Sequence, residues 1–146
     1  MKKLLVAILG LFSVLFSNPA VAEPQKNIVT VVTSSHAQTQ LMAMVLTMQA
    51  VKQGANAHIL LCGDAGDMAL KDAPKTVTAP QKPKGMSPQK LMKLIMEKTK
   101  TKVEVCALYL PNKDMKASEL IDGITAANPQ RMGQRLLVDN VRILSF

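Results

Sequence analysis

The sequence predicts a three-layer α/β protein with a five-stranded, mainly parallel sheet and helices on both faces. Strand-like and helix-like segments alternate along the chain from residue 27, as parallel strands joined by crossover helices do. The strongest strand candidates are short runs of β-branched or other apolar residues, each followed by a polar or glycine-containing turn. Because crossovers between parallel strands are right-handed, the simplest arrangement is a doubly wound, flavodoxin-like sheet.

The first 22 residues have the three parts of a secretory signal peptide. Two lysines precede an apolar core from Leu4 to Phe16, and Ala20 and Ala22 form an A-x-A cleavage site. This core is too short to span a bilayer comfortably, and no later stretch is apolar for long enough. We therefore expect residues 1–22 to be removed, residues 23–146 to form one domain, and the mature protein to be periplasmic or secreted without stable membrane insertion.

The first half of the domain contains two strand candidates around a helix. NIVTVVT, from Asn27, is rich in β-branched residues and predicts the first strand. Residues 38–53 have helical length and composition, with Gly54 at the C-terminal cap position. The second strand is NAHILLC from Asn56, and GDAGDMALKD is a turn that leads into a short helix. Apolar residues surround much of the 38–53 helix, so we expect it to be covered by the sheet and by another subunit.

The second half begins with residues 73–88, whose four prolines and three lysines predict a loop. Ser87 followed by Pro88 predicts a capped amphipathic helix, and Asn128 followed by Pro129 predicts another. KVEVCAL, residues 102–108, predicts the third strand. The remaining predictions are a short helix at 118–123, a short fourth strand at 124–127 and a fifth strand at 141–146.

Composition and motifs exclude several functions. The chain is basic, with a formal net charge of +8, but only 3% of its residues are aromatic, so bases would find almost no stacking platform. We therefore expect no nucleic-acid partner, and a small anion or an acidic partner fits the charge as well. No P-loop, G-x-G-x-x-G, G-x-S-x-G or HExxH motif is present in the sequence.

Both cysteines are expected where ligands of open α/β sheets bind, at the carboxyl ends of strands. Cys62 ends the second predicted strand and Cys106 lies near the end of the third. Each could be a buried thiol, half of a disulfide or a nucleophile. In a flavodoxin-like order these strands flank the first one, about 9.6 Å apart, whereas bridged Cα atoms lie within about 7 Å. This order argues against an intramolecular disulfide.

Other side chains near this edge are candidates for a supporting role. His36, in the turn after the first strand, is placed to line the same rim, and Lys113 follows Cys106 closely in sequence. His58, inside the second strand, is expected to be structural. The methionines lie mostly at helical positions, where they fill a core, so we expect neither a copper site nor any other metal site.

Four segments together resemble the DsrE/DsrF-like family, including its YchN-like members. They are LLCGDAGDMAL, VEVCALYLPN, SELIDGITAA and VRILSF, and the resemblance extends from Asn27 to Phe146. It implies a compact α/β fold with a five-stranded sheet, a trimer or hexamer, and a cysteine that carries sulfane sulfur as a persulfide without a cofactor. That cysteine matches Cys106. This chain departs from the sulfur carriers in having an export signal and in ALYLPNKDM after Cys106, which lacks their small-residue run ending in arginine and glycine.

The sequence therefore predicts an exported DsrE-like protein that carries or relays sulfane sulfur on a single cysteine, Cys106. His36, Cys62, Lys113 and the basic loop at 71–84 are candidates for handling an anionic substrate. Its partners would be sulfur donor and acceptor proteins or small thiols. The alternative is a non-catalytic oligomeric module that binds a small ligand or a protein while Cys106 stays buried, and thiol accessibility separates the two.

Overall fold

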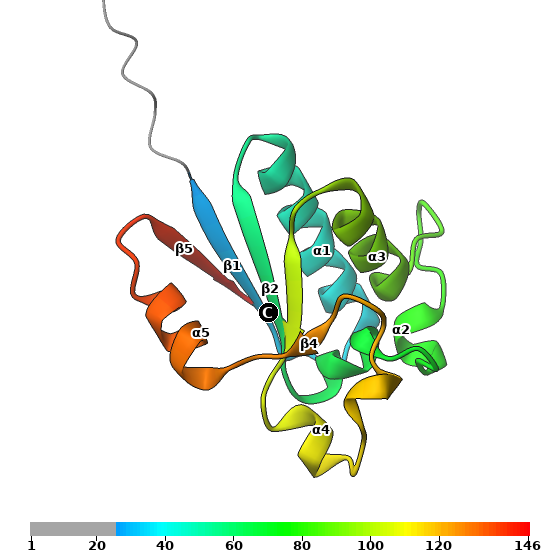
Figure 1. Ribbon diagram of the computed structural model, residues 1–146. Helices are drawn as coiled ribbons and strands as arrows, with labels where there is room; N and C mark the ends of the chain where they lie inside the picture. Colours follow the sequence, from blue (N-terminus) through cyan, green and yellow to red (C-terminus); the bar gives the residue numbers. More distant parts are fainter. Residues whose placement is uncertain (1–25) are drawn as a thin grey trace, which may run out of the picture.

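A computed structural model describes residues 26–146, so the predicted signal peptide and its cleavage site lie outside the described residues. Five parallel strands form one sheet in the order β4-β3-β2-β1-β5 (Figure 1). The bounds are β1 Asn27–Val32, β2 Asn56–Leu61, β3 Lys102–Val105, β4 Thr125–Ala126 and β5 Val141–Ser145. The predicted three-layer α/β fold with five strands is confirmed, and the sheet is wholly parallel.

The strand order differs from the one expected from the sequence. β3 pairs with β2, so these two strands are neighbours and do not flank β1. The other side of β1 is occupied by β5, which pairs with it from Asn27 opposite Val141 to Val31 opposite Ser145. Because the C-terminal strand occupies that position, β3 and β4 extend the sheet beyond β2.

Helices cover the two faces of the sheet unequally. α1 (Ala37–Lys52) and α3 (Pro88–Lys98) pack side by side on one face, together with the 3₁₀ helix η1 (Gly63–Ala69) and the short α2 (Lys75–Thr78) (Figure 1). Among residues 26–146, α5 (Pro129–Leu136) is the one helix on the opposite face. Neighbouring residues of a strand point to opposite faces, so each strand contributes to a large core under α1 and α3 and to a small one under α5.

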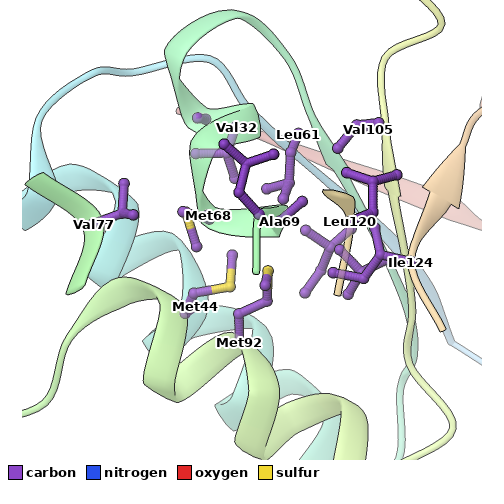
Figure 2. Packing of buried hydrophobic residues seen from close by; sticks show 14 of the residues in the cluster. Val32, Met44, Leu61, Met68, Ala69, Val77, Met92, Val105, Leu120 and Ile124 are labelled. Atoms are coloured by element: carbon purple, nitrogen blue, oxygen red, sulfur yellow. The ribbon is translucent and has the colours of Figure 1, made fainter. Parts of the chain in front are cut away.

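Methionines form the centre of the larger core. Met44 from α1, Met68 from η1 and Met92 from α3 are fully buried and converge beneath the sheet (Figure 2). This confirms for these residues that methionine serves as a core side chain. Two apolar residues of α1 are instead exposed. Met42 is 50% exposed and Leu46 is 43% exposed, on the side of the helix that faces away from the sheet.

Local capping follows the sequence predictions closely. The Ser87 hydroxyl accepts a hydrogen bond from the Lys90 amide at 3.2 Å, and Asn128 Oδ1 accepts one from the Arg131 amide at 3.0 Å. These side chains satisfy amides that a helix start leaves without partners. The Ser-Pro and Asn-Pro pairs are therefore the starts of α3 and α5, as predicted.

Three local predictions need correction. The expected loop at 73–88 contains the one-turn helix α2, which is anchored by the buried Val77. The third strand ends at Val105, because the Tyr109 amide bonds the Cys106 carbonyl at 2.9 Å and starts the short helix α4 (Tyr109–Asn112). The helix expected at 118–123 is a single 3₁₀ turn, η2 (Ala117–Glu119). In the described part of the chain, no helix has both the length and the apolar character needed to cross a membrane.

Candidate functional site

Alternating residues of β2 and β3 form three rows on the sheet face that carries α5. On this face His58 stands opposite Lys102 and Leu60 opposite Glu104, whereas Leu61 and Val105 stand opposite each other on the other face. One step further along the same register, Cys62 stands opposite Cys106. The amide of Cys106 bonds the Leu61 carbonyl at 2.8 Å, so the ladder continues to the cysteines after both strands have ended.

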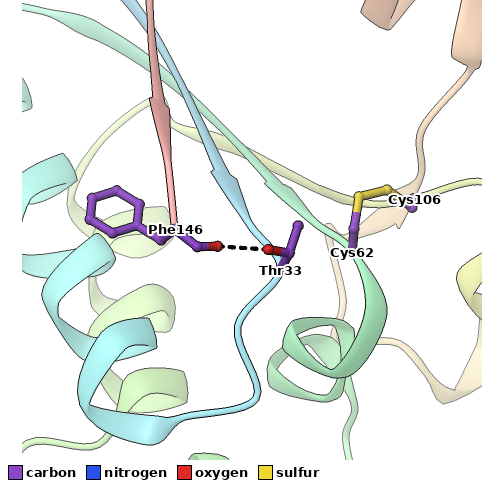
Figure 3. The surroundings of a disulfide bond; sticks show 4 residues. All are labelled: Thr33, Cys62, Cys106 and Phe146. Carbon is purple, nitrogen blue, oxygen red and sulfur yellow. Dashed lines mark hydrogen bonds between the residues drawn. A yellow bond between two sulfur atoms is a disulfide. The ribbon is translucent and has the colours of Figure 1, made fainter.

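Cys62 and Cys106 are joined by a disulfide at this carboxyl edge (Figure 3). Their Cα atoms lie 5.0 Å apart, within the range of bridged cysteines. The sequence argument against this bond is therefore wrong. It depended on a strand order that separates the second and third strands by β1, whereas adjacent parallel strands lie about 4.8 Å apart. Both cysteines are partly exposed and pack against the small core under α5.

The segments that follow the two cysteines are bound to each other. Cys62 leads into η1 and Cys106 leads into α4. The Tyr109 hydroxyl donates a hydrogen bond to Asp67 Oδ1 at 2.7 Å, and the Lys113 ammonium pairs with the same oxygen. Lys113 also lies over the Tyr109 ring, 5.2 Å from its centre. Burial and the bond to Asp67 raise the pKa of Tyr109, which therefore stays a neutral donor.

Close packing of backbone and ring completes this connection. A Cβ atom added at Gly66 would overlap the ring of Tyr109, so η1 and α4 approach each other only because residue 66 is glycine. The turn after Cys62 and the turn after Cys106 thus form one rigid unit. The contacts that hold this unit together do not involve the two sulfur atoms.

The end of β5 closes the edge beside the cysteines. The Phe146 carbonyl accepts a hydrogen bond from the Thr33 hydroxyl at 2.9 Å (Figure 3). It also accepts hydrogen bonds from the Thr33 amide at 2.7 Å and the Ser34 amide at 3.3 Å. His36 lies in the same loop, as predicted, and is exposed. Its side chain caps no amide of α1. The predicted contribution of His36 to the site remains a prediction.

The charge of Lys113, a candidate from the sequence for handling an anionic substrate, is paired in the structure. The ammonium of Lys113 is held by Asp67, which neutralises it. A different source of positive potential is the amino end of α5. Ala127 packs in the same small core as both cysteines, and α5 starts directly after it with Asn128 as the N-cap. A helix amino terminus favours thiolate over thiol.

Toward the amino ends of the same strands, the sheet face holds a buried ionic cluster. His58 Nε2 lies 2.8 Å from Glu104 Oε2, and the Lys102 ammonium lies 2.9 Å from Glu104 Oε1. Burial lowers the pKa of His58, and the positive charge of Arg135 lowers it further, against the opposing effect of Glu104. Burial alone would raise the pKa of Glu104, but the bond from Lys102 and the charges around it lower the pKa.

Two adjoining hollows of about 450 and 500 Å³ lie beside this cluster. They share Arg135 and several residues at the starts of β1 and β2, and Arg131 lines the first while Lys100 and Lys102 line the second. Neither lining contains an acidic residue. His58 was expected to be structural, and its burial agrees with that expectation.

Sequence reasoning placed Cys62, Cys106 and His36 at one edge but missed Asp67 and Tyr109. Asp67 belongs to a segment whose sequence predicts only a turn and a short helix, and no pattern of short range links it to Tyr109, 42 residues away. Within residues 26–146, no group of three or more His, Cys, Asp or Glu side chains is arranged to hold a metal ion.

Two solved structures have the same fold as this chain. The YchN protein from E. coli superimposes with a TM-score of 0.65 at 18% identity, covering 84% of this chain and 100% of that chain. MTH1491 from Methanobacterium thermoautotrophicum, a protein of unknown function, superimposes with a TM-score of 0.57 at 6% identity and the same coverage. No family model and no curated protein matches the sequence. At these identities the likeness concerns the α/β fold with its five parallel strands.

Proposed function

We propose that this chain is an exported sulfane-sulfur carrier that holds the transferred sulfur as a persulfide on Cys106. The observation that carries the proposal is the placement of two partly exposed cysteines, Cys62 and Cys106, opposite each other where β2 and β3 end. The carboxyl edge is where open α/β sheets bind their ligands. The resemblance to the DsrE/DsrF-like family assigns the carrier thiol to Cys106.

In the proposed reaction, the thiolate of Cys106 attacks the outer sulfur of a donor persulfide, R–S–SH. A Cys106–S–SH persulfide forms and the donor leaves as the thiolate RS⁻. An acceptor thiolate then takes the outer sulfur and returns Cys106 as thiolate. A cysteine within a disulfide has no thiolate, so a dithiol must first reduce the Cys62–Cys106 bond.

The neighbourhood of Cys106 suits a protein donor or acceptor. Leu108, two residues further on, is 70% exposed and offers an apolar contact beside the thiol. The partners would therefore be proteins that present a persulfide or a thiol, or small thiols that reach the same edge.

Export is part of the same proposal and is supported by the signal-like residues 1–22. A disulfide between Cys62 and Cys106 is consistent with an oxidising compartment such as the periplasm. The mass of the protein recovered from whole cells tests this: cleavage after Ala22 would leave a chain that starts at Glu23. Recovery of the unprocessed chain alone would contradict export.

Assembly into a trimer or hexamer is also proposed, with α1 in the interface. Met42 and Leu46 form an exposed apolar pair on this helix, and a second subunit would cover them. Light scattering after gel filtration gives the mass of the assembly, and replacement of both residues by glutamine should reduce it to that of one chain. A wild-type mass equal to one chain would contradict the proposal.

The second candidate function is a binding module in which the disulfide is only a cross-link. The bonds between η1 and α4 favour it, because Tyr109, Asp67 and Lys113 hold the cysteine turns together as a structural clasp would. In this case the reduced thiols would take up no sulfur.

Intact-mass spectrometry separates the two candidates. The purified protein is reduced with a dithiol, freed of reductant and incubated with a small-molecule persulfide. The Cys62→Ser variant should gain about 32 Da, one sulfur atom, and the Cys106→Ser variant should gain nothing. Folding of each variant is checked by circular dichroism. If no folded variant gains sulfur, the carrier function is wrong and the binding module becomes the better explanation.

A further inference from the structure

The structure places a second thiol within bonding distance of the proposed carrier thiol. Cys62 and Cys106 face each other in the parallel register, with 5.0 Å between Cα atoms, and they already form a bond. A carrier that only receives and passes on sulfur needs a single cysteine. The function proposed above therefore leaves Cys62 without a role.

We propose, building on that carrier function, that Cys62 is a second catalytic residue that discharges the sulfur from Cys106 as hydrosulfide. The Cys62 thiol loses its proton to solvent, and the thiolate attacks the Cys106 sulfur atom of the persulfide. The bond between the two cysteine sulfurs forms, the bond from Cys106 to the outer sulfur breaks, and HS⁻ leaves with the electron pair. The sulfane sulfur is reduced to sulfide, and the two cysteines are oxidised to the disulfide.

A dithiol reductant completes the cycle. It attacks the Cys62–Cys106 disulfide, becomes a disulfide itself and restores both thiols. The net reaction converts a persulfide and a dithiol into a thiol, a disulfide and hydrosulfide. In an oxidising compartment this ties sulfide release to the supply of reducing equivalents, because the oxidised chain accepts no further sulfur.

The geometry around the pair supports direct attack without rearrangement of the backbone. The amide of Cys106 bonds the Leu61 carbonyl and the amide of Cys62 bonds the Val32 carbonyl, at 2.8 and 2.9 Å. Neither these ladder bonds nor the contact of Asp67 with Tyr109 involves a sulfur atom. Holding two reacting groups in place in this way raises the rate of the step between them.

The partial exposure of Cys62 and Cys106 agrees with the proposed cycle, in which two external molecules must reach the sulfur atoms. The donor and the reductant must each reach a sulfur atom, and neither cysteine is fully buried. The pair packs against Leu60 and Met132 on its inner side. The two cysteines are therefore covered by this small core in part and reach solvent with the remainder of their surface.

Sulfide release and mass measured together test the inference. Reduced protein, freed of reductant, receives one equivalent of a small-molecule persulfide, and samples are taken over time. For the wild type we expect about one HS⁻ per chain and a final mass about 2 Da below that of the reduced chain, which is the disulfide. For Cys62→Ser we expect a gain of about 32 Da that persists, with hydrosulfide release at least tenfold slower. Cys62→Ala is made as a second variant in case the serine hydroxyl disturbs packing.

The outcomes distinguish this inference from the carrier function. A wild-type protein that keeps the added sulfur as stably as Cys62→Ser overturns the role of Cys62 and leaves the carrier function standing. A Cys62→Ser protein that takes up nothing, or that gains the organic group of the donor in place of sulfur, overturns the carrier function as well. Cys106→Ser that still releases hydrosulfide at the wild-type rate assigns the chemistry to Cys62 alone and overturns both assignments.

Discussion

Strands β2 and β3 hold polar or reactive side chains at both of their ends, on one face and in one register. At the carboxyl edge, Cys62 and Cys106 are partly exposed and share a bond that an external thiol can exchange. Toward the amino ends, His58 and Glu104 are only 3% and 6% exposed. They contact each other, and the Lys102 ammonium pairs with Glu104. The two pairs lie on the same strands and the same face. The difference in exposure therefore determines that the cysteine pair can react with an external molecule and that the His58–Glu104 pair cannot.

The largest effect is expected at the buried end, from Glu104→Ala. Glu104 contacts the buried His58 and the half-exposed Lys102, so its removal leaves the buried imidazole of His58 without its acceptor. Breaking a buried pair by removing one partner typically costs about 3–5 kcal/mol of unfolding free energy. Urea unfolding followed by circular dichroism measures this loss.

Glu97→Ala provides the matched control for Glu104→Ala. Glu97 also pairs with a lysine, its neighbour Lys98, but both side chains are exposed. We expect no measurable change, because exposed pairs contribute little to stability. Equal losses of unfolding free energy for Glu97→Ala and Glu104→Ala would show that burial does not determine how much these contacts stabilise the protein.

At the carboxyl edge, reduction of the disulfide should cost somewhat less. The bond closes a loop between residues 44 positions apart in sequence. A cross-link of this kind typically stabilises a protein by about 2–4 kcal/mol, chiefly by restricting the unfolded chain. Urea midpoints with and without a dithiol measure the difference. The Cys62→Ser/Cys106→Ser double variant has no bond to lose, so a dithiol should leave its midpoint unchanged.

The third largest effect is expected from Gly66→Ala, which disturbs the packing between η1 and α4 and leaves both cysteines in place. Gly66→Ala forces a methyl group into the Tyr109 ring. We expect a loss of about 1–3 kcal/mol, typical of overpacking. The change should also slow reformation of the disulfide from the reduced protein, since η1 and α4 would no longer approach closely.

Gly133→Ala is the control for Gly66→Ala. Gly133 lies inside α5 with open space around it, so a methyl group meets nothing there. Alanine should raise stability by about 0.5–1 kcal/mol, because glycine weakens a helix interior. A loss for Gly133→Ala, or no loss for Gly66→Ala, would refute the packing argument.

Much of the fold was predictable because its signals are local. The β-branched run from Asn27 and the Ser87-Pro88 and Asn128-Pro129 pairs each depend on a few neighbouring residues. The structure places strands and helix starts at these positions. Strand order is not local. Nothing within β2 or β3 states that β5 pairs with β1, and it is this pairing that makes β2 and β3 neighbours.

The candidate site also has features that the local sequence predicts and features that depend on tertiary contacts. Cys62 and Cys106 could be assigned to the carboxyl edge from strand patterns alone. Their bond could not be predicted, because it follows from the strand order. The contact between Asp67 and Tyr109 joins segments 42 residues apart, and no local pattern indicates that Lys113, a candidate for handling an anionic substrate, pairs with Asp67. Tertiary contacts of this type carry no signature in a single sequence.

The smallest effect concerns pH and sharpens the contrast between the two ends. Burial and the charge of Arg135 lower the pKa of His58 below 6.5. In the unfolded chain, His58 takes up a proton at the ordinary pKa of histidine, whereas in the folded chain it does so only at lower pH. At a pH between these two pKa values, the unfolded chain therefore binds more protons than the folded chain does. Stability should therefore fall as the pH drops through this window. Glu104, whose pKa lies below 4.5, adds a further loss only at more acidic pH.

Urea midpoints of the oxidised protein at about pH 7.5 and pH 5.5 measure the effect of His58, since free histidine titrates between them. The His58→Gln variant keeps a polar partner for Glu104 and should lose most of the difference between the two midpoints. His36→Gln is the control, because His36 is exposed at the other end of the sheet and should keep the wild-type difference. If His36→Gln removed the pH dependence and His58→Gln did not, the sensitive group would lie at the carboxyl edge. The buried cluster would then be insensitive to pH in this range, and the loop beside the cysteines would carry the response.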